Sequence, residues 1–313
     1  MARKLRVQYP GAIYHVMNRG DRREPVFEDD NDHTLFLDTL GEACRKTGWR
    51  VHAWCLMANH FHLVIETPQG NLVPGMKWLL ATYTGRFNRR HKQLGHLFSG
   101  RYKALIVDGS GTGYLKTVCD YVHLNPARAR LLRPEQKLQS YRWSSLRFYL
   151  TPPRKRPGWL KVGRLLGDYG IPQDSKAGRQ EFARRMESRR ESEASPGEFK
   201  ALRRGWYLGD KAFRKELLAQ MKEQMGEHHY GEERVETGEE KAEGIVRQRL
   251  KQLGWTEADL AARRKGDPRK VKLAARLRAE TTVTVKWIAT RLHMGTWTHL
   301  NHLLYWHRRR KIG

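Results

Sequence analysis

The chain has 313 residues, and 60 Lys and Arg against 33 Asp and Glu give it a formal net charge of +27. Hydrophobic residues make up 39% of the sequence, which is enough to build folded cores and excludes a wholly disordered basic tail. No segment reaches the roughly 20 consecutive apolar residues of a membrane span, and the N-terminus runs into polar sequence where a signal peptide would be apolar. These features predict a cytoplasmic protein.

The positive charge is spread along the whole chain, with a net +11 in residues 1–150 and +16 in residues 151–313. Such a surplus repels itself unless a polyanion neutralises it, and nucleic acid is the usual partner because each phosphate contact releases a counterion. A solvated basic surface and an RNA-packing protein are the alternatives. The three cysteines, Cys44, Cys55 and Cys119, form no close pair, so neither a disulfide framework nor a thiolate zinc site is predicted.

The first part of the chain alternates between strand and helix patterns. Strands are predicted at residues 11–19, 49–59, 60–67 and 101–108, and helices at residues 30–48, 74–92 and 111–126. Pro126 is expected to end the last helix. This βαββαβ order with a further helix predicts an α+β ferredoxin-like sandwich, in which one antiparallel sheet carries helices packed on one face.

A stretch rich in Pro, Gly, Lys and Arg at residues 151–170 predicts a domain boundary, after which the sequence becomes helical. Residues 188–198 and 231–244 are charged and poor in apolar side chains, which predicts linkers, and residues 209–225 between them predict an amphipathic helix. The expected organisation is a first domain over residues 1–150, a connector over 151–239 and a helical DNA-binding domain over 240–313.

The C-terminal region has the pattern of a helix-turn-helix. Asp267 is expected as an N-cap with Pro268 at the first helical position, Met294 and Gly295 as a turn, and Thr296 as the cap of the last helix. The second helix of such a pair lies in the major groove. Its expected DNA contacts are Thr296, Trp297, Thr298, His299 and Asn301 at the leading end, and Arg308, Arg309 and Arg310 near phosphates. A helical hairpin that packs on the first domain is the alternative.

Two histidines on one strand are candidate metal ligands. His60 and His62 are two residues apart, so both imidazoles project from one face of the strand while Phe61 points the other way. Two imidazoles on one face can hold one metal ion. An alternating pair of ordinary polar residues gives the same pattern.

A second candidate element lies on the helix near residue 120. Tyr121 and Asn125 are four residues apart and share a helical face, so a phenol and an amide oxygen are directed to one place. Helix geometry alone favours the other interpretation, in which Tyr121 is a core aromatic and Asn125 is a C-cap before Pro126. Tyr114, seven residues before Tyr121, is a rival nucleophile.

Several ordered motifs resemble a known family. These are YPGAIYHVMNRG at residues 9–20, NHFHL at 59–63, SGRYKALIVD at 99–108, YLKTVCDYVHLNPARARLL at 114–132 and YRWSSLRFYL at 141–150. Together they make residues 8–150 similar to the single-tyrosine HUH transposases of the insertion-sequence class, and within them to the REP-associated tyrosine transposases. The resemblance implies that His60, His62 and Asn125 bind Mg²⁺ or Mn²⁺, with Asn125 where other members have Gln, and that Tyr121 is the nucleophile.

The resemblance also implies the reaction. Tyr121 would attack a phosphate of single-stranded DNA, at the foot of a hairpin, and form a 5′-phosphotyrosine bond with release of a 3′-hydroxyl. The base that accepts the phenol proton is not identified, although Lys103, Lys116 and His123 are nearby in sequence. The expected contacts of the first domain with DNA are Arg19, Arg22, Arg23, Arg86, Arg89, Arg90, Arg101, Lys103, Arg128 and Arg130.

The C-terminal part has a looser resemblance. Residues 240–311, including RRKGDPRKVKLAARLRAE, are similar to the helical DNA-binding domain of the bacterial replication initiator DnaA. This likeness implies that recognition of a duplex or a hairpin stem is added to single-strand cleavage. A non-catalytic DNA-binding regulator and an RNA-binding protein without chemistry are the rival functions, and the sequence leaves both a monomer and a homodimer open.

Overall fold

The structure is a computed structural model that describes residues 7–111, 113–192, 202, 205–224 and 233–309. The chain divides into two compact units. The first comprises Met1–Cys44, Gly48–Gly70 and Leu79–His229, and the second comprises Arg45–Thr47, Asn71–Trp78 and Tyr230–Gly313. The proposed division into residues 1–150, 151–239 and 240–313 stays a prediction.

The first unit is built on a five-stranded sheet with the order β2-β3-β1-β4-β5. The strands are β1 (Ala12–Arg19), β2 (Arg50–Met57), β3 (His60–Thr67), β4 (Lys103–Val107) and β5 (Tyr207–Leu208). The pairs among the first four strands are antiparallel, and β5 pairs with β4 in parallel. The predicted α+β class is therefore confirmed. The sequence did not predict β5, because two residues are too few to show an alternating pattern.

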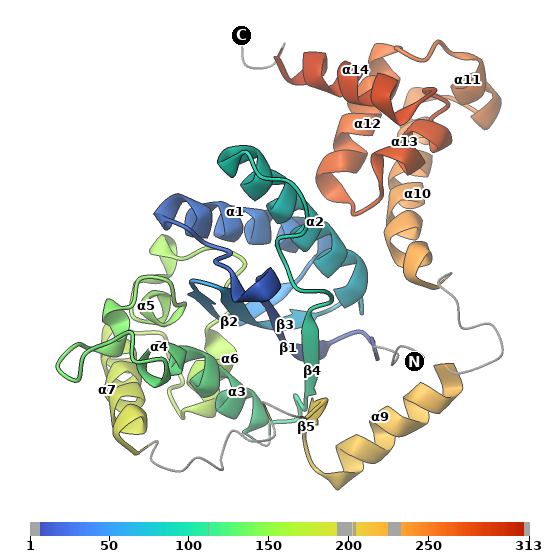
Figure 1. Ribbon diagram of the computed structural model, residues 1–313. Helices are drawn as coiled ribbons and strands as arrows, with labels where there is room; N and C mark the ends of the chain where they lie inside the picture. Colours follow the sequence, from blue (N-terminus) through green and yellow to red (C-terminus); the bar gives the residue numbers. More distant parts are fainter. Residues whose placement is uncertain (1–6, 112, 193–201, 203–204, 225–232, 310–313) are drawn as a thin grey trace. The chain divides into compact units, whose positions relative to one another are not determined.

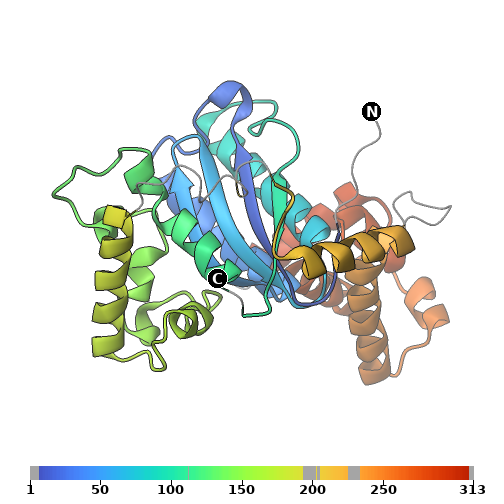
Figure 2. The same cartoon turned by 90° about the horizontal axis from the view of Figure 1, so that it is seen from below.

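Helices lie on both faces of this sheet (Figures 1 and 2). On one face, the ring of Phe61 packs against Phe36 of α1 (Asp30–Thr47), which in turn packs against Tyr83 of α2 (Leu72–His91). On the other face, α3 (Tyr114–His123) brings Tyr121 against His62. The expectation that helices cover one face only is therefore wrong: α1 and α2 share one face, whereas α3 packs against the opposite face.

The helix that carries Tyr121 is shorter than predicted. It ends at His123, and a second short helix, α4 (Asn125–Arg128), follows with Pro126 in its first turn. A proline is well tolerated in a first turn, where its missing N–H would have no helical partner. Pro126 therefore begins α4 instead of ending the longer helix expected over residues 111–126.

Further elements complete the first unit. They are η1 (Asp21–Arg23), η2 (Leu138–Ser140), α5 (Leu146–Tyr149), η3 (Pro153–Lys155), α6 (Gly163–Asp168), α7 (Lys176–Ser192) and α9 (Lys211–Gln224). The backbone N–H of Lys161 donates to the carbonyl of Val51 at 2.8 Å, which ties the segment before α6 to the outer edge of β2. Phe182 of α7 is fully buried against Tyr149 and Tyr169. The amphipathic helix predicted at residues 209–225 corresponds to α9.

The second unit is helical. Its helices are α10 (Glu233–Leu253), α11 (Glu257–Ala262), α12 (Pro268–Glu280), α13 (Val285–Arg291) and α14 (Trp297–Arg309). Their shared core includes Val246, Leu277, Ile288 and Leu300, all fully buried. Within the described ranges, no helix has the length and apolar character needed to cross a membrane.

One predicted linker is wrong. Residues 231–244 were expected to be irregular, but α10 begins at Glu233 and runs through them. Glu, Lys and Ala are strong helix formers, and Ala242 begins an apolar face that continues with Ile245 and Val246 into the core. The other predicted linker is wrong in its first part, because residues 188–192 form the end of α7, and its residues 193–198 lie outside the described residues.

The predicted caps of the second unit are confirmed. The Asp267 side chain accepts from the backbone N–H groups of Arg269 and Lys270, with Pro268 following as the first helical residue of α12. At α14, the Thr296 hydroxyl accepts from the N–H of His299 at 3.3 Å. Gly295 in the preceding turn has φ +82°, a conformation that favours glycine.

Candidate active site

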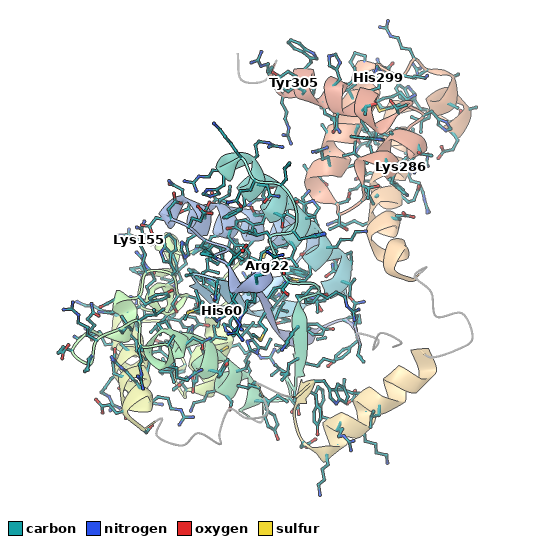
Figure 3. All side chains as sticks on the ribbon, in the orientation of Figure 1. Arg22, His60, Lys155, Lys286, His299 and Tyr305 are labelled. Carbon is teal, nitrogen blue, oxygen red and sulfur yellow. The ribbon has the colours of Figure 1, made fainter. Side chains whose placement is uncertain are left out.

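One face of the sheet carries the candidate ligands and two basic side chains. In the pairing of β1 with β3, Arg19 is opposite His60 and Met17 is opposite His62. In the pairing of β1 with β4, Met17 is also opposite Lys103. Because paired residues and alternate residues share a face, Arg19, His60, His62 and Lys103 all project toward the side covered by α3. Figure 3 labels His60 in this part of the first unit.

Each candidate histidine ligand has a partner on its Nδ1 atom. His60 Nδ1 lies 2.7 Å from the Asn59 amide oxygen, and His62 Nδ1 lies 2.9 Å from Nε2 of His15. These contacts orient both rings so that their Nε2 atoms are the ones suited to bind a metal ion. The centroids of the two rings are 5.1 Å apart.

The sequence did not identify His15 as a residue of the site. It is 2% exposed on β1 and stacks on His62, with ring centroids 5.2 Å apart. The sequence offers one signal for His15, the alternation of side chains along a strand, which puts it on the same face as Met17 and Arg19. Its contact with His62 depends on the pairing of β1 with β3, and the two histidines are 47 residues apart in the chain.

Tyr121 lies directly beside the two buried histidines. Its ring centroid is 5.7 Å from that of His62 and 5.6 Å from that of His15, and the residue is 8% exposed. The guanidinium of Arg128 lies over the Tyr121 ring at 4.2 Å and also donates to the Tyr121 carbonyl at 2.6 Å. Tyr114, the rival nucleophile, is the first residue of α3, about two turns away.

Asn125 belongs to the same cluster. It is 8% exposed at the start of α4, and its amide oxygen accepts from Arg128 at 3.2 Å. Its Nδ2 is buried and has no hydrogen-bond partner among the described residues. A buried amide nitrogen without a partner is uncommon, and this one would be satisfied by a hydrogen-bond acceptor.

The site favours neutral imidazoles. Burial lowers the pKa of His15 to about 4, and the charge of Arg128 acts in the same direction. Burial, together with the charge of Arg19, lowers the pKa of His60 to about 4, and burial is also the largest cause of the strongly lowered pKa of His62. A metal ion binds only the unprotonated ring, so at neutral pH both ligands are in the binding form.

The residues fit a divalent metal ion. The described residues contain no group of three or more His, Cys, Asp or Glu arranged for metal binding, so the set depends on the Asn125 amide oxygen as its third donor. Two oriented imidazoles and one amide oxygen suit Mn²⁺ and similar ions, and they leave coordination positions for a phosphate.

Two of the three side chains considered as the base that accepts the phenol proton contact other residues. His123 is 1% exposed, its Nε2 lies 2.8 Å from the Ser145 hydroxyl, and burial lowers its pKa to about 3. The ammonium of Lys116 lies over the ring of Tyr169 at 4.2 Å. Lys103 is exposed on the site face. The first two contacts favour a structural role for His123 and for Lys116.

The basic candidates in the first unit fall into two groups. Arg86 and Arg90 form ion pairs with Glu42 and with Asp29 and Asp32. The other candidates, apart from the half-buried Arg128, are exposed: Arg19, Arg22, Arg23, Arg89, Arg101, Lys103 and Arg130.

The loop that carries Arg22 and Arg23 is connected to the site. The amide nitrogen of Asn59 donates to the Arg23 carbonyl at 3.0 Å, while its oxygen lies against His60. Asn59 therefore links the basic η1 segment to a candidate metal ligand.

The C-terminal candidates are mostly exposed on α14 and its cap. Trp297 is 53% exposed, and His299, Thr296 and Thr298 are exposed, with the two threonine hydroxyls 2.8 Å apart. Asn301 is half-buried, and its amide oxygen accepts from Arg278 at 3.0 Å. Arg308 and Arg309 are exposed, and Arg310 lies outside the described residues.

Comparison with known proteins gives a family match for part of the chain. Residues 8–125 match the family model described as "Transposase IS200 like". A solved structure of a REP-associated tyrosine transposase bound to a REP hairpin is similar, with 13% identity, coverage of 51% of this chain and 91% of that chain, and a TM-score of 0.41. No curated protein matches the chain. The likeness of residues 240–311 to the DnaA domain stays a prediction.

Proposed function

We propose that the first unit is a metal-dependent single-stranded DNA endonuclease and strand transferase that acts through a 5′-phosphotyrosine intermediate. The observation that carries this proposal is the position of Tyr121, whose ring lies 5.7 Å from that of His62 on the strand that also holds His60. A phenol beside two oriented, neutral imidazoles has the composition of a phosphoryl-transfer site.

Different residues of the site would have different roles in the reaction. His60, His62 and Asn125 would hold Mg²⁺ or Mn²⁺, which when bound polarises the scissile phosphate. Arg128 fixes the ring of Tyr121 from above and holds the Asn125 amide. The Tyr121 oxygen attacks phosphorus, the bond from phosphorus to the 3′ oxygen breaks, and the strand leaves with a 3′-hydroxyl. That hydroxyl can later attack the phosphotyrosine and rejoin DNA without an external energy source.

The substrate we propose is single-stranded DNA next to a hairpin. Arg19 and Lys103 are exposed on the same sheet face as the histidines, and the η1 loop with Arg22 and Arg23 is bonded to Asn59 beside His60. A basic surface at the edge of a nuclease site can follow the backbone of a single strand. The exposed Arg101 and Arg130 are further candidates for the same role.

For the second unit we propose DNA binding that adds target choice to cleavage. The two helices α13 and α14 are joined by a short turn, and α14 presents Thr296, Trp297, Thr298 and His299 at its leading end. This layout matches a helix-turn-helix, and the exposed Arg308 and Arg309 lie at the other end of the same helix.

The test of the nuclease is covalent capture. The full chain is incubated with labelled single-stranded hairpin DNA and Mn²⁺ or Mg²⁺, with Tyr121→Phe and Tyr114→Phe in parallel, and the products are separated on a denaturing gel. We expect a protein–DNA band with the wild type and with Tyr114→Phe and none with Tyr121→Phe. Tight DNA binding without any band would favour a non-catalytic DNA-binding protein.

A further inference from the structure

Helix α14 combines exposed aromatic rings with positive charge. Trp297, Tyr305 and Trp306 are 53%, 51% and 46% exposed, and the helix contains no Asp or Glu. We propose that α14 binds unpaired DNA bases by stacking them on these rings. The inference rests on the proposal that the chain acts on DNA and specifies which form of DNA the second unit holds.

The three rings are not needed for the fold of the second unit. Leu300 and Leu304, which are 0% and 5% exposed, are the residues of α14 buried in the helical core. At 3.6 residues per turn, Tyr305 is displaced from Trp297 by about 80° around the helix and Trp306 by about 180°. Trp297 and the pair of Tyr305 and Trp306 are therefore two separate places on the surface of α14, on which Figure 3 labels Tyr305 and His299. Large apolar rings left in water on a polar, cationic helix are typical of a binding surface.

Stacking requires bases whose faces are accessible. In a duplex each base face is covered by its neighbours, and side chains in the major groove contact only base edges, mainly through hydrogen bonds. Unpaired bases expose both faces, and proteins that bind single strands stack successive bases on aromatic side chains. Trp297, Tyr305 and Trp306 therefore fit unpaired bases better than an intact groove.

The rings are partly fixed in place. The indole N–H of Trp306 donates to Nε2 of His302 at 2.9 Å, and the guanidinium of Arg309 lies 5.3 Å from the centre of the Tyr305 ring. The Tyr305 and Trp306 rings meet edge to face at 5.5 Å. Rings that are already oriented lose less side-chain freedom when a base binds.

A cationic cavity beside α14 is suited to the sugar–phosphate backbone. Its volume is about 430 Å³, and it is formed by α10, α12 and α14. The charged and polar lining consists of Arg249, Lys272, Arg276, Glu280 and His307. Glu280 is the one acid of that lining and forms an ion pair with Arg276 at 2.9 Å, so the remaining charge favours a phosphate. Proteins that bind single strands combine a cationic groove with aromatic rings, and α14 both contributes His307 to the cavity and carries the three rings.

The test is photo-crosslinking of the full chain to a thymine-rich single strand that contains 5-iododeoxyuridine, which crosslinks to aromatic side chains stacked on it. Trypsin would release the three aromatics together in the peptide of residues 292–308. We expect crosslinks at Trp297, Tyr305 or Trp306 with the single strand, and none when the same base is paired in a duplex. Crosslinks confined to the first unit would overturn the proposal.

Matched variants supply a second measurement. Trp297→Ala combined with Trp306→Ala should weaken binding of the single strand by about tenfold or more, whereas the double Phe replacement should retain most of the affinity. An equal loss of duplex affinity in the Ala variant would mean that α14 reads a groove, which would refute stacking. Because crosslinking does not require cleavage, loss of the covalent Tyr121 product with intact crosslinks would contradict only the nuclease proposal.

Discussion

The Nε2 of His15 and the Nδ1 of His62 lie 2.9 Å apart across the neighbouring strands β1 and β3. One of these nitrogens donates a hydrogen to the other, and the near-parallel rings, with an interplanar angle of 15°, pack in the buried layer beneath Tyr121. A ligand histidine is oriented by the partner on its other nitrogen. His15 therefore controls how His62 presents its Nε2, although it would not touch the metal ion itself.

Replacement of His15 tests this positioning role. His15→Phe keeps a buried ring and removes the hydrogen bond, so it should lower metal affinity by about 10–100-fold, with a parallel loss of cleavage at low metal concentration. Titration calorimetry with Mn²⁺ measures the first effect directly. A variant that folds normally, as judged by circular dichroism, and binds Mn²⁺ like the wild type would remove His15 from the site.

Asn59 is expected to have two separable roles. Asn59→Asp keeps an oxygen acceptor for His60 Nδ1 but loses the donor to the Arg23 carbonyl, whereas Asn59→Ala loses both bonds. Metal affinity should therefore fall only in Asn59→Ala, and DNA affinity should fall in both variants because the η1 loop loses its side-chain hydrogen bond to Asn59. The prediction fails if Asn59→Asp loses metal affinity to the same extent as Asn59→Ala.

The spacing of apolar and polar residues in the sequence predicted most of the helices and strands of the first unit. It also predicted that His60 and His62 project from the same face of their strand. It did not reveal His15, because contact with His62 depends on the register between β1 and β3 and no local period encodes that register. The sequence also did not reveal which face of the sheet α3 covers, because tertiary packing determines that face. In the second unit, the low apolar content of residues 231–238 concealed a helix whose stability depends on Ala242, Ile245 and Val246 further along.

Arg128 is expected to matter for the cleavage step more than for DNA affinity. Its guanidinium stacks on Tyr121 and donates to Asn125, so Arg128→Met leaves the proposed nucleophile and the proposed third ligand less well fixed. These two contacts correspond to about 2–4 kcal/mol, so covalent product should form about 100-fold more slowly at saturating DNA in a single turnover. Arg133→Met, an exposed arginine five residues later, is the matched control and should keep the wild-type rate.

Metal removal should separate binding from chemistry. Excess EDTA is expected to abolish the covalent product while the hairpin stays bound, because the phosphate contacts proposed for the exposed side chains Arg19 and Lys103 do not require the ion. Gel-shift and covalent-capture assays on the same samples measure the two effects. Cleavage that persists in EDTA would contradict a metal role for His60 and His62.

Lys270 should stabilise the second unit and fix the turn before α14. It is fully buried, and its ammonium donates to the carbonyls of Arg263 at 3.1 Å and His293 at 3.3 Å. Lys270→Met keeps the hydrocarbon chain but leaves both carbonyls without this donor, which should lower the free energy of unfolding by about 1–3 kcal/mol. Denaturant unfolding, with hydrogen exchange of the backbone amides in α12–α14 as the probe, measures this decrease in the free energy of unfolding. A probe within the second unit is needed because the two units need not unfold together.

The matched control for Lys270 is Lys272→Met, an exposed position on the same helix, whose effect on stability should stay within about 0.5 kcal/mol. His293 has φ +50° and lies in the turn that directs the chain into α14, so a loosened turn should also disorder Trp297 at the start of that helix. Lys270→Met should therefore weaken crosslinking to the single strand under conditions in which the unit is still folded. Full crosslinking together with lowered stability would limit Lys270 to a role in folding.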